Sequence, residues 1–181
     1  RISREWRRVN GGGVNSLGIR IGVAGGNECD KDTYALAEEV GTYIAQVGAV
    51  LVCGGRLGVM EAAAKGAKLA GGVTIGILPG YDRSEANPFI EHAISTGLGQ
   101  ARNLLVVLNS DVLLAIGGEA GTLSEIALAL KHNISVVALR SWKLEAIANM
   151  DGFYPCGDAK NAVQLALELS RDKCRVSGPK E

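Results

Sequence analysis

The chain has 181 residues, a length that falls within the range of about 100–200 residues usual for one domain. Its 19 Lys and Arg residues balance 19 Asp and Glu residues, which disfavours nucleic-acid binding through a broadly basic face. No apolar run reaches the roughly 18–20 residues that cross a bilayer, so we expect no membrane association. The four cysteines form no C-x-x-C pair, so we expect no structural metal, and reduced thiols in a cytoplasmic protein.

Short runs rich in Val and Ile alternate along the chain with longer segments of helical periodicity. We expect residues 1–18 to form a flexible arm, residues 19–170 one ligand-binding domain, and residues 171–181 a frayed tail. The predicted strands are Ile19–Ala24, Ala49–Cys53, Val73–Leu78, Val112–Ile116 and Ile134–Leu139, with a further short strand at His92–Ser95. The predicted helices are Asp32–Val47, Gly58–Ala70, Gln100–Asn109, Thr122–Lys131 and Asp158–Ser170. This alternation predicts a single doubly wound, Rossmann-like α/β domain, with a mainly parallel sheet and helices on both faces.

The glycines gather where the predicted strands end, which is the edge at which such sheets bind ligands. Two of these turns, at residues 53–61 and 116–125, lead directly into helices. A helix start offers free N–H groups and a partial positive charge, and glycine lets the backbone approach a phosphate closely. The alternative is that small residues only let helices pack close to strands. The predicted phosphate-binding glycines are Gly25, Gly26, Gly54, Gly55, Gly58, Gly118 and Gly121, with Thr122 beside them.

Several familiar motifs are absent from the sequence. The first glycine turn lacks the G-x-G-x-x-G order, and Cys53 stands where an acidic ribose ligand is expected, so we predict no NAD site. There is no G-x-x-x-x-G-K-[ST] for a P-loop, and no G-x-S-x-G for a serine hydrolase.

Arg102 and Glu125 are the charged residues that the pattern singles out. Arg102 lies in the opening turn of a predicted helix, where the helix dipole disfavours a cation unless a bound phosphate compensates. An ordinary surface arginine is the alternative. Glu125 has capping-box spacing from Thr122, but a carboxylate there could also contact a ribose hydroxyl or stabilise an oxocarbenium ion.

Taken in order, four motifs resemble the Lonely Guy-like superfamily, whose members were long labelled possible lysine decarboxylases. The likeness covers about Arg20 to Leu139 and is closest to the molybdenum cofactor carrier branch. In the superfamily signature P-G-G-x-G-T-x-x-E, the proline falls on Gly117 and the second glycine on Glu119, and the lysine after the arginine becomes Asn103. The motifs are Gly54-Gly55…Gly58-Val59-Met60-Glu61-Ala62-Ala63, Gly76-Ile77-Leu78-Pro79-Gly80, Thr96-Gly97…Ala101-Arg102-Asn103 and Gly118…Gly121-Thr122…Glu125.

The resemblance implies binding of a phosphorylated pterin- or nucleotide-like ligand at the carboxyl edge of the sheet, foremost the molybdenum cofactor, held for storage or transfer. Arg102 would then neutralise charge, while Asn103 and Glu125 would contact the organic part. The alternative is a nucleoside monophosphate phosphoribohydrolase, in which Arg102 and Glu125 are catalytic; a nucleotide sensor is a third reading. The resemblance also implies a homo-oligomer, a dimer or tetramer. Nothing in the sequence marks a Schiff-base lysine for pyridoxal phosphate, which argues against a lysine decarboxylase.

Overall fold

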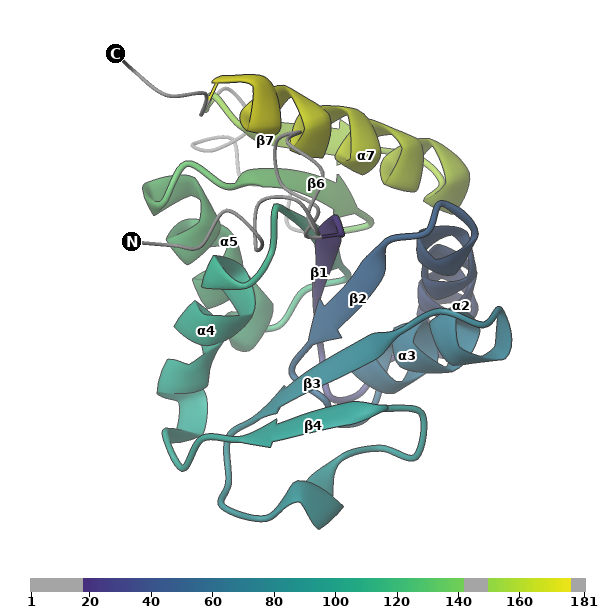
Figure 1. The fold of residues 1–181 in the computed structure, drawn as a ribbon, viewed down its shortest axis with the longest axis vertical. Coiled ribbons are helices and arrows are strands. Elements are labelled where there is room, and N and C mark those ends of the chain that lie inside the picture. Colours follow the sequence, from purple (N-terminus) through teal and green to yellow (C-terminus); the bar gives the residue numbers. More distant parts are fainter. Residues whose placement is uncertain (1–17, 142–149, 177–181) are drawn as a thin grey trace, which may run out of the picture.

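The computed structural model describes residues 18–141 and 150–176, so most of the expected arm and the end of the expected tail lie outside the described residues. Seven parallel strands form one sheet in the order β4-β3-β2-β1-β5-β6-β7 (Figure 1). The order runs outward in both directions from β1, so the point where it reverses lies between β1 and β5. The strands are β1 (Arg20–Gly25), β2 (Val50–Cys53), β3 (Thr74–Leu78), β4 (His92–Ser95), β5 (Val112–Ile116), β6 (Ser135–Leu139) and β7 (Phe153–Cys156).

Helices cover both faces of the sheet, with α2, α3 and α7 on one face and α4 and α5 on the other (Figure 1). The central strand β5 is buried along its whole length, as a strand covered on both faces must be. No helix within the described ranges has both the length and the apolar composition needed to cross a membrane. The helices are α2 (Lys31–Gln46), α3 (Val59–Leu69), α4 (Asn103–Leu108), α5 (Ala120–Lys131) and α7 (Ala159–Val176), with 3-10 turns η1 (Arg83–Glu85) and η2 (Gly99–Arg102).

Alternate side chains of the strands supply the two cores. From β5, Leu114 and Ile116 enter the core beneath α2, α3 and α7, while Leu113 and Ala115 enter the core beneath α4 and α5. Asp30 caps α2, because its carboxylate accepts a hydrogen bond of 2.7 Å from the backbone N–H of Thr33. This cap sets the start of α2 at Lys31, in the segment that follows β1.

The predicted fold class is confirmed, and most element bounds differ from the predicted ones by one or two residues. The sequence reading missed β7, a short edge strand interrupted by Pro155, which an edge position tolerates. It also joined η2 and α4 into one helix, although Arg102 ends the 3-10 turn and α4 begins at Asn103. The last helix continues to Val176, six residues beyond the predicted end at Ser170.

Helices α2 and α3 cross at glycines on both sides. A Cβ atom added to Gly41 would lie 1.9 Å from the carbonyl oxygen of Ala63, and one added to Gly66 would lie 1.9 Å from that of Glu38. The backbone of each helix therefore touches the other helix where a side chain would stand. This close contact fixes α3, and with it the turn before α3, relative to α2.

We expect Gly66→Ala to destabilise the protein by about 3 kcal/mol, even though alanine is the better helix former, because the methyl group forces the helices apart. The free energy of unfolding in urea measures the effect. Gly157→Ala is the matched control, because a Cβ at Gly157 meets no atom within 4 Å. Equal stability of the two variants would contradict the close crossing.

Candidate functional site

A cavity of about 620 Å³ lies at the carboxyl end of the sheet. Its lining residues come from the segments that follow the first five strands, so it spans the point where the strand order reverses. This is the usual ligand position in an open parallel sheet. The lining residues are Gly25, Asn27, Arg56, Met60, Pro79, Gln100, Arg102, Asn103, Glu119, Ala120, Gly121, Thr122, Ser124 and Glu125.

Arg102 is a buried residue of the cavity wall, with 6 % of its surface exposed, and is not the ordinary surface arginine of the alternative reading. Its Nη1 donates a hydrogen bond of 2.6 Å to Oδ1 of Asn103. Room for the guanidinium is provided by Gly54, because a Cβ there would lie 2.5 Å from Nη2 of Arg102. Burial lowers the pKa of Arg102, but a guanidinium stays charged in proteins.

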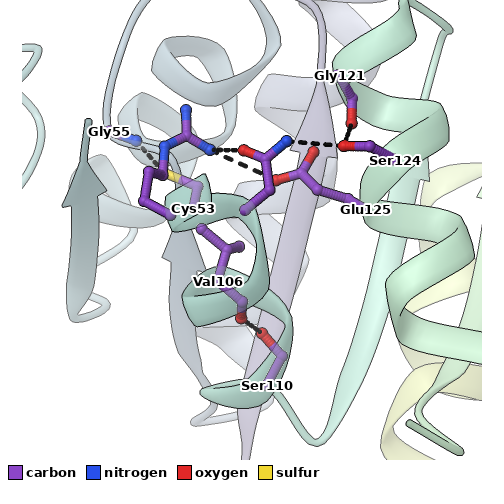
Figure 2. Close-up of polar contacts among 9 residues, drawn as sticks. Cys53, Gly55, Val106, Ser110, Gly121, Ser124 and Glu125 are labelled. Carbon is purple, nitrogen blue, oxygen red and sulfur yellow. Dashed lines mark hydrogen bonds and ion pairs between the residues drawn. The ribbon is translucent and has the colours of Figure 1, made fainter. Parts of the chain in front are cut away.

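A chain of hydrogen bonds ties Arg102 to the first turn of α5 (Figure 2). Asn103 accepts from Arg102 and donates through Nδ2 to Oγ of Ser124 over 2.8 Å. The Ser124 hydroxyl in turn donates to the carbonyl oxygen of Gly121 over 2.7 Å. Both ends of the Asn103 amide are therefore engaged within the protein, and the guanidinium has a fixed position relative to the start of α5.

Glu125 lies beside this chain, with 5 % of its surface exposed (Figure 2). Its Oε1 is 3.6 Å from Nη1 of Arg102, which forms an ion pair longer than a hydrogen bond. Burial raises the pKa of Glu125 to about 7, although the charge of Arg102 opposes this shift. The site thus contains a carboxyl group that titrates near neutral pH.

The start of α5 differs from the sequence prediction. The helix begins at Ala120 with Glu119 as its N-cap, so the predicted capping box of Thr122 and Glu125 is wrong. Neither side chain caps the helix, because both lie beyond the N-cap position and are buried. Oγ1 of Thr122 and Nε of Arg102 are buried without a hydrogen-bond partner among the described residues. The hydroxyl groups of Ser95 and Ser141, which do not line the cavity, are unpartnered in the same way, so the lack of a partner does not by itself mark a ligand site.

In the turn between β2 and α3, two backbone N–H groups donate within the protein. The N–H of Gly55 donates to Sγ of Cys53 over 3.3 Å (Figure 2), and that of Val59 donates to the carbonyl oxygen of Gly26 over 3.1 Å. Gly58 has a φ of 63°, and a Cβ there would lie 2.5 Å from the Gly26 carbonyl oxygen. Gly58 therefore lets the turns after β1 and β2 approach each other closely.

The structure brings six of the predicted site residues together in the cavity wall. The other predicted glycines do not line it, and their role as phosphate donors stays a prediction. Sequence reasoning missed Asn27, Arg56, Gln100, Glu119 and Ser124 as lining residues, although each lies within a few residues of a glycine in a turn after a strand. The residues brought together are Gly25, Arg102, Asn103, Gly121, Thr122 and Glu125; those outside are Gly26, Gly54, Gly55, Gly58 and Gly118.

The fold and the cavity define a Rossmann-like protein with a cavity of ligand size at the carboxyl end of its sheet. The charged side chains of the lining are two cations, Arg56 and Arg102, and two carboxyl groups, Glu119 and Glu125. The N–H groups at the start of α5 and the amide groups of Asn27 and Gln100 add hydrogen-bond donors. The chain belongs to the SLOG cluster4 family, which it matches over residues 18–163. The resemblance to the Lonely Guy-like superfamily, near the molybdenum cofactor carrier branch, is thereby confirmed.

Two solved structures and one curated relative are similar over most of their length. The molybdenum cofactor binding protein of Rippkaea orientalis is 40 % identical, with a TM-score of 0.82, covering 86 % of this chain and 99 % of that one. The molybdenum cofactor carrier protein of Chlamydomonas reinhardtii is 38 % identical, with a TM-score of 0.77, covering 84 % and 98 %. An uncharacterised protein of Archaeoglobus fulgidus is 48 % identical over 122 residues, which is 67 % of this chain and 80 % of that protein.

Proposed function

We propose that the protein binds the molybdenum cofactor in the cavity at the carboxyl edge of the sheet and stores or transfers it. The observation that carries this proposal is the similarity, at about 40 % identity over the whole fold, to proteins described as molybdenum cofactor binding or carrier proteins. Residues 19–170 would act as one ligand-binding domain, assembled into a homo-oligomer.

The chemistry of the cavity supports this ligand. The phosphate of the cofactor would dock between Arg102 and the start of α5, where Thr122 lacks a partner for its hydroxyl group. The pterin is a flat ring system with hydrogen-bonding edges, and amide groups such as those of Asn27 and Gln100 suit these edges. At about 620 Å³, the cavity has the size of an ordinary cofactor site.

Reconstitution tests the proposal. Molybdenum cofactor released from a donor molybdoenzyme is mixed anaerobically with the protein, and unbound cofactor is removed by gel filtration. We expect pterin and molybdenum to elute with the protein in equal amounts, close to one of each per chain, and to activate a cofactor-free molybdoenzyme afterwards. Elution of the cofactor entirely in the low-molecular-weight fraction would contradict the proposal.

The second candidate function is hydrolysis of the N-glycosidic bond of a nucleoside monophosphate. The contact of 3.6 Å between Arg102 and Glu125 in the cavity wall favours it, because a carboxylate there could stabilise positive charge on a ribose. Glu119 disfavours it, because this carboxylate lines the cavity where the superfamily signature has a glycine. The carrier function therefore fits the site better.

Incubation with a panel of nucleoside monophosphates separates the two functions. We expect no release of free base by the wild-type protein above the background of a Glu125→Ala variant, as chromatography would show. Base release that disappears in Glu125→Ala would establish the hydrolase instead. Binding of a nucleotide without turnover, accompanied by a change of assembly, would indicate a nucleotide sensor.

A further inference from the structure

Arg102 and Glu125 place opposite charges side by side where an anion is expected to dock. Their closest atoms, Nη1 and Oε1, are 3.6 Å apart, and both residues line the cavity. They are 6 % and 5 % exposed, so solvent screens the pair only weakly. An oxyanion that docks on the guanidinium must therefore lie close to the carboxylate of Glu125.

Two negative charges this close in a buried site favour protonation of the one that can accept a proton. Glu125 is that group, because Arg102 keeps its proton under all conditions of interest. Burial already raises the pKa of the Glu125 carboxyl to about 7, so a proton is available to it near neutral pH. A dianion beside the pair would raise this pKa further.

The other charged groups near the pair do not replace Glu125 as the proton acceptor. Cys53 lies below Arg102 in the buried end of β2, and burial raises the pKa of its thiol to about 12, so the thiol stays neutral. Arg56, in the exposed turn after β2, adds positive charge. Glu119 lines the same cavity from the N-cap of α5, where it is exposed to solvent. Asn103 and Ser124, which contact Arg102 and the first turn of α5, carry no charge.

We infer that the cavity takes up the dianionic phosphate monoester of its ligand together with one proton from solvent, and that this proton is held on the carboxyl group of Glu125. The inference rests on the proposed function only in so far as the ligand carries a phosphate monoester; a phosphorylated pterin and a nucleotide meet the same pair. Once neutral, Glu125 no longer offsets the charge of Arg102, and the guanidinium is free for the phosphate. The affinity for the dianion is then higher below the pKa of Glu125 than above it, and a rise in pH promotes release.

Calorimetry with sulfate tests this inference, because sulfate is a tetrahedral dianion throughout the pH range used and does not titrate itself. Binding heats measured in two buffers of different ionisation enthalpy give the number of protons taken up. We expect about half a proton per sulfate at pH 7 and close to one at pH 8.5, with the affinity falling about fivefold between pH 7 and 8 and about tenfold per pH unit above 8. These measurements use the wild-type protein and do not depend on the folding of any variant.

Two variants identify the group that takes up the proton. Glu125→Gln should bind sulfate with a pH-independent affinity and no proton uptake. Glu119→Gln removes the other carboxylate of the cavity, and should bind sulfate more tightly at every pH while keeping the proton uptake of the wild type.

Proton uptake below about a tenth of a proton in the wild type would overturn the inference, as would loss of uptake in Glu119→Gln. So would the absence of sulfate binding at every pH. If the molybdenum cofactor fails to bind while sulfate binds with proton uptake, the proposed cargo is wrong and the inference stands. If the cofactor binds but sulfate binds with no proton uptake, the proposed cargo stands and the inference about Glu125 is wrong.

Discussion

Replacing Arg102 with glutamine is expected to weaken cofactor binding by about 100-fold, which corresponds to about 3 kcal/mol. The guanidinium is the buried cation of the cavity wall, and its hydrogen bond to Asn103 fixes its position before a ligand arrives. Glutamine is shorter and uncharged, so it cannot offer a charged pair of donors to a phosphate. Anaerobic ultrafiltration over a range of protein concentrations measures the affinity, with the retained pterin quantified by its fluorescence after oxidation.

Arg56→Gln is the matched control for this experiment. Arg56 lines the same cavity but is exposed to solvent, so its charge is screened and its side chain is less ordered. We expect the control to weaken binding by less than about tenfold. Equal losses in the two variants would mean that the cavity attracts the ligand by its overall charge, without a defined position at Arg102.

The second large effect is a pH dependence of folding stability that comes from Glu125. Its carboxyl group has a pKa of about 7 in the folded protein because burial disfavours the charge, against an ordinary value of 4.5. Between these two values the folded state binds more protons than the unfolded state, so the free energy of unfolding falls as the pH rises. Relative to a Glu125→Gln variant, the wild-type protein should lose on the order of 3 kcal/mol between about pH 4.5 and pH 8.

Urea unfolding of both proteins at a series of pH values measures this difference. Removing the carboxylate also leaves Arg102 without its ion-pair partner, which changes the stability of Glu125→Gln at every pH. The test is therefore how the stability difference between wild type and Glu125→Gln changes with pH. Glu39→Gln, at an exposed carboxyl on α2, gives the reference for removing one negative charge. A constant difference between wild type and Glu125→Gln across the pH range would contradict a titration of Glu125 near neutral pH.

The sequence predicted the fold well because the signals for it are local and repeated. Apolar runs such as Val112–Ile116 and helical periods such as that of α3 each occur several times, and their alternation leaves few topologies open. The strand β7 was not predicted, because four residues that include Pro155 carry no periodic signal. The crossing of α2 and α3 at Gly41 and Gly66 depends on the relative placement of two helices, which a pattern in one helix does not encode.

The site was predicted in its residue types more than in its geometry. Arg102 and Glu125 were singled out from their positions next to helix starts, and they do meet in the cavity. The sequence did not show that α5 begins two residues earlier than predicted, which changes Glu125 from a capping group to a buried partner of Arg102. It also did not show that the N–H of Gly55 donates to Cys53, because that hydrogen bond depends on how the turn folds back over β2.

A crystal structure of the protein with the molybdenum cofactor bound tests most directly whether Arg102 and the first turn of α5 form the phosphate site. We expect the phosphate within hydrogen-bond distance of the Arg102 guanidinium and of the Thr122 hydroxyl, with the pterin inside the cavity. A cofactor bound with its phosphate elsewhere, for example at the turn between β2 and α3 while Arg102 stays paired with Glu125 alone, would contradict this assignment.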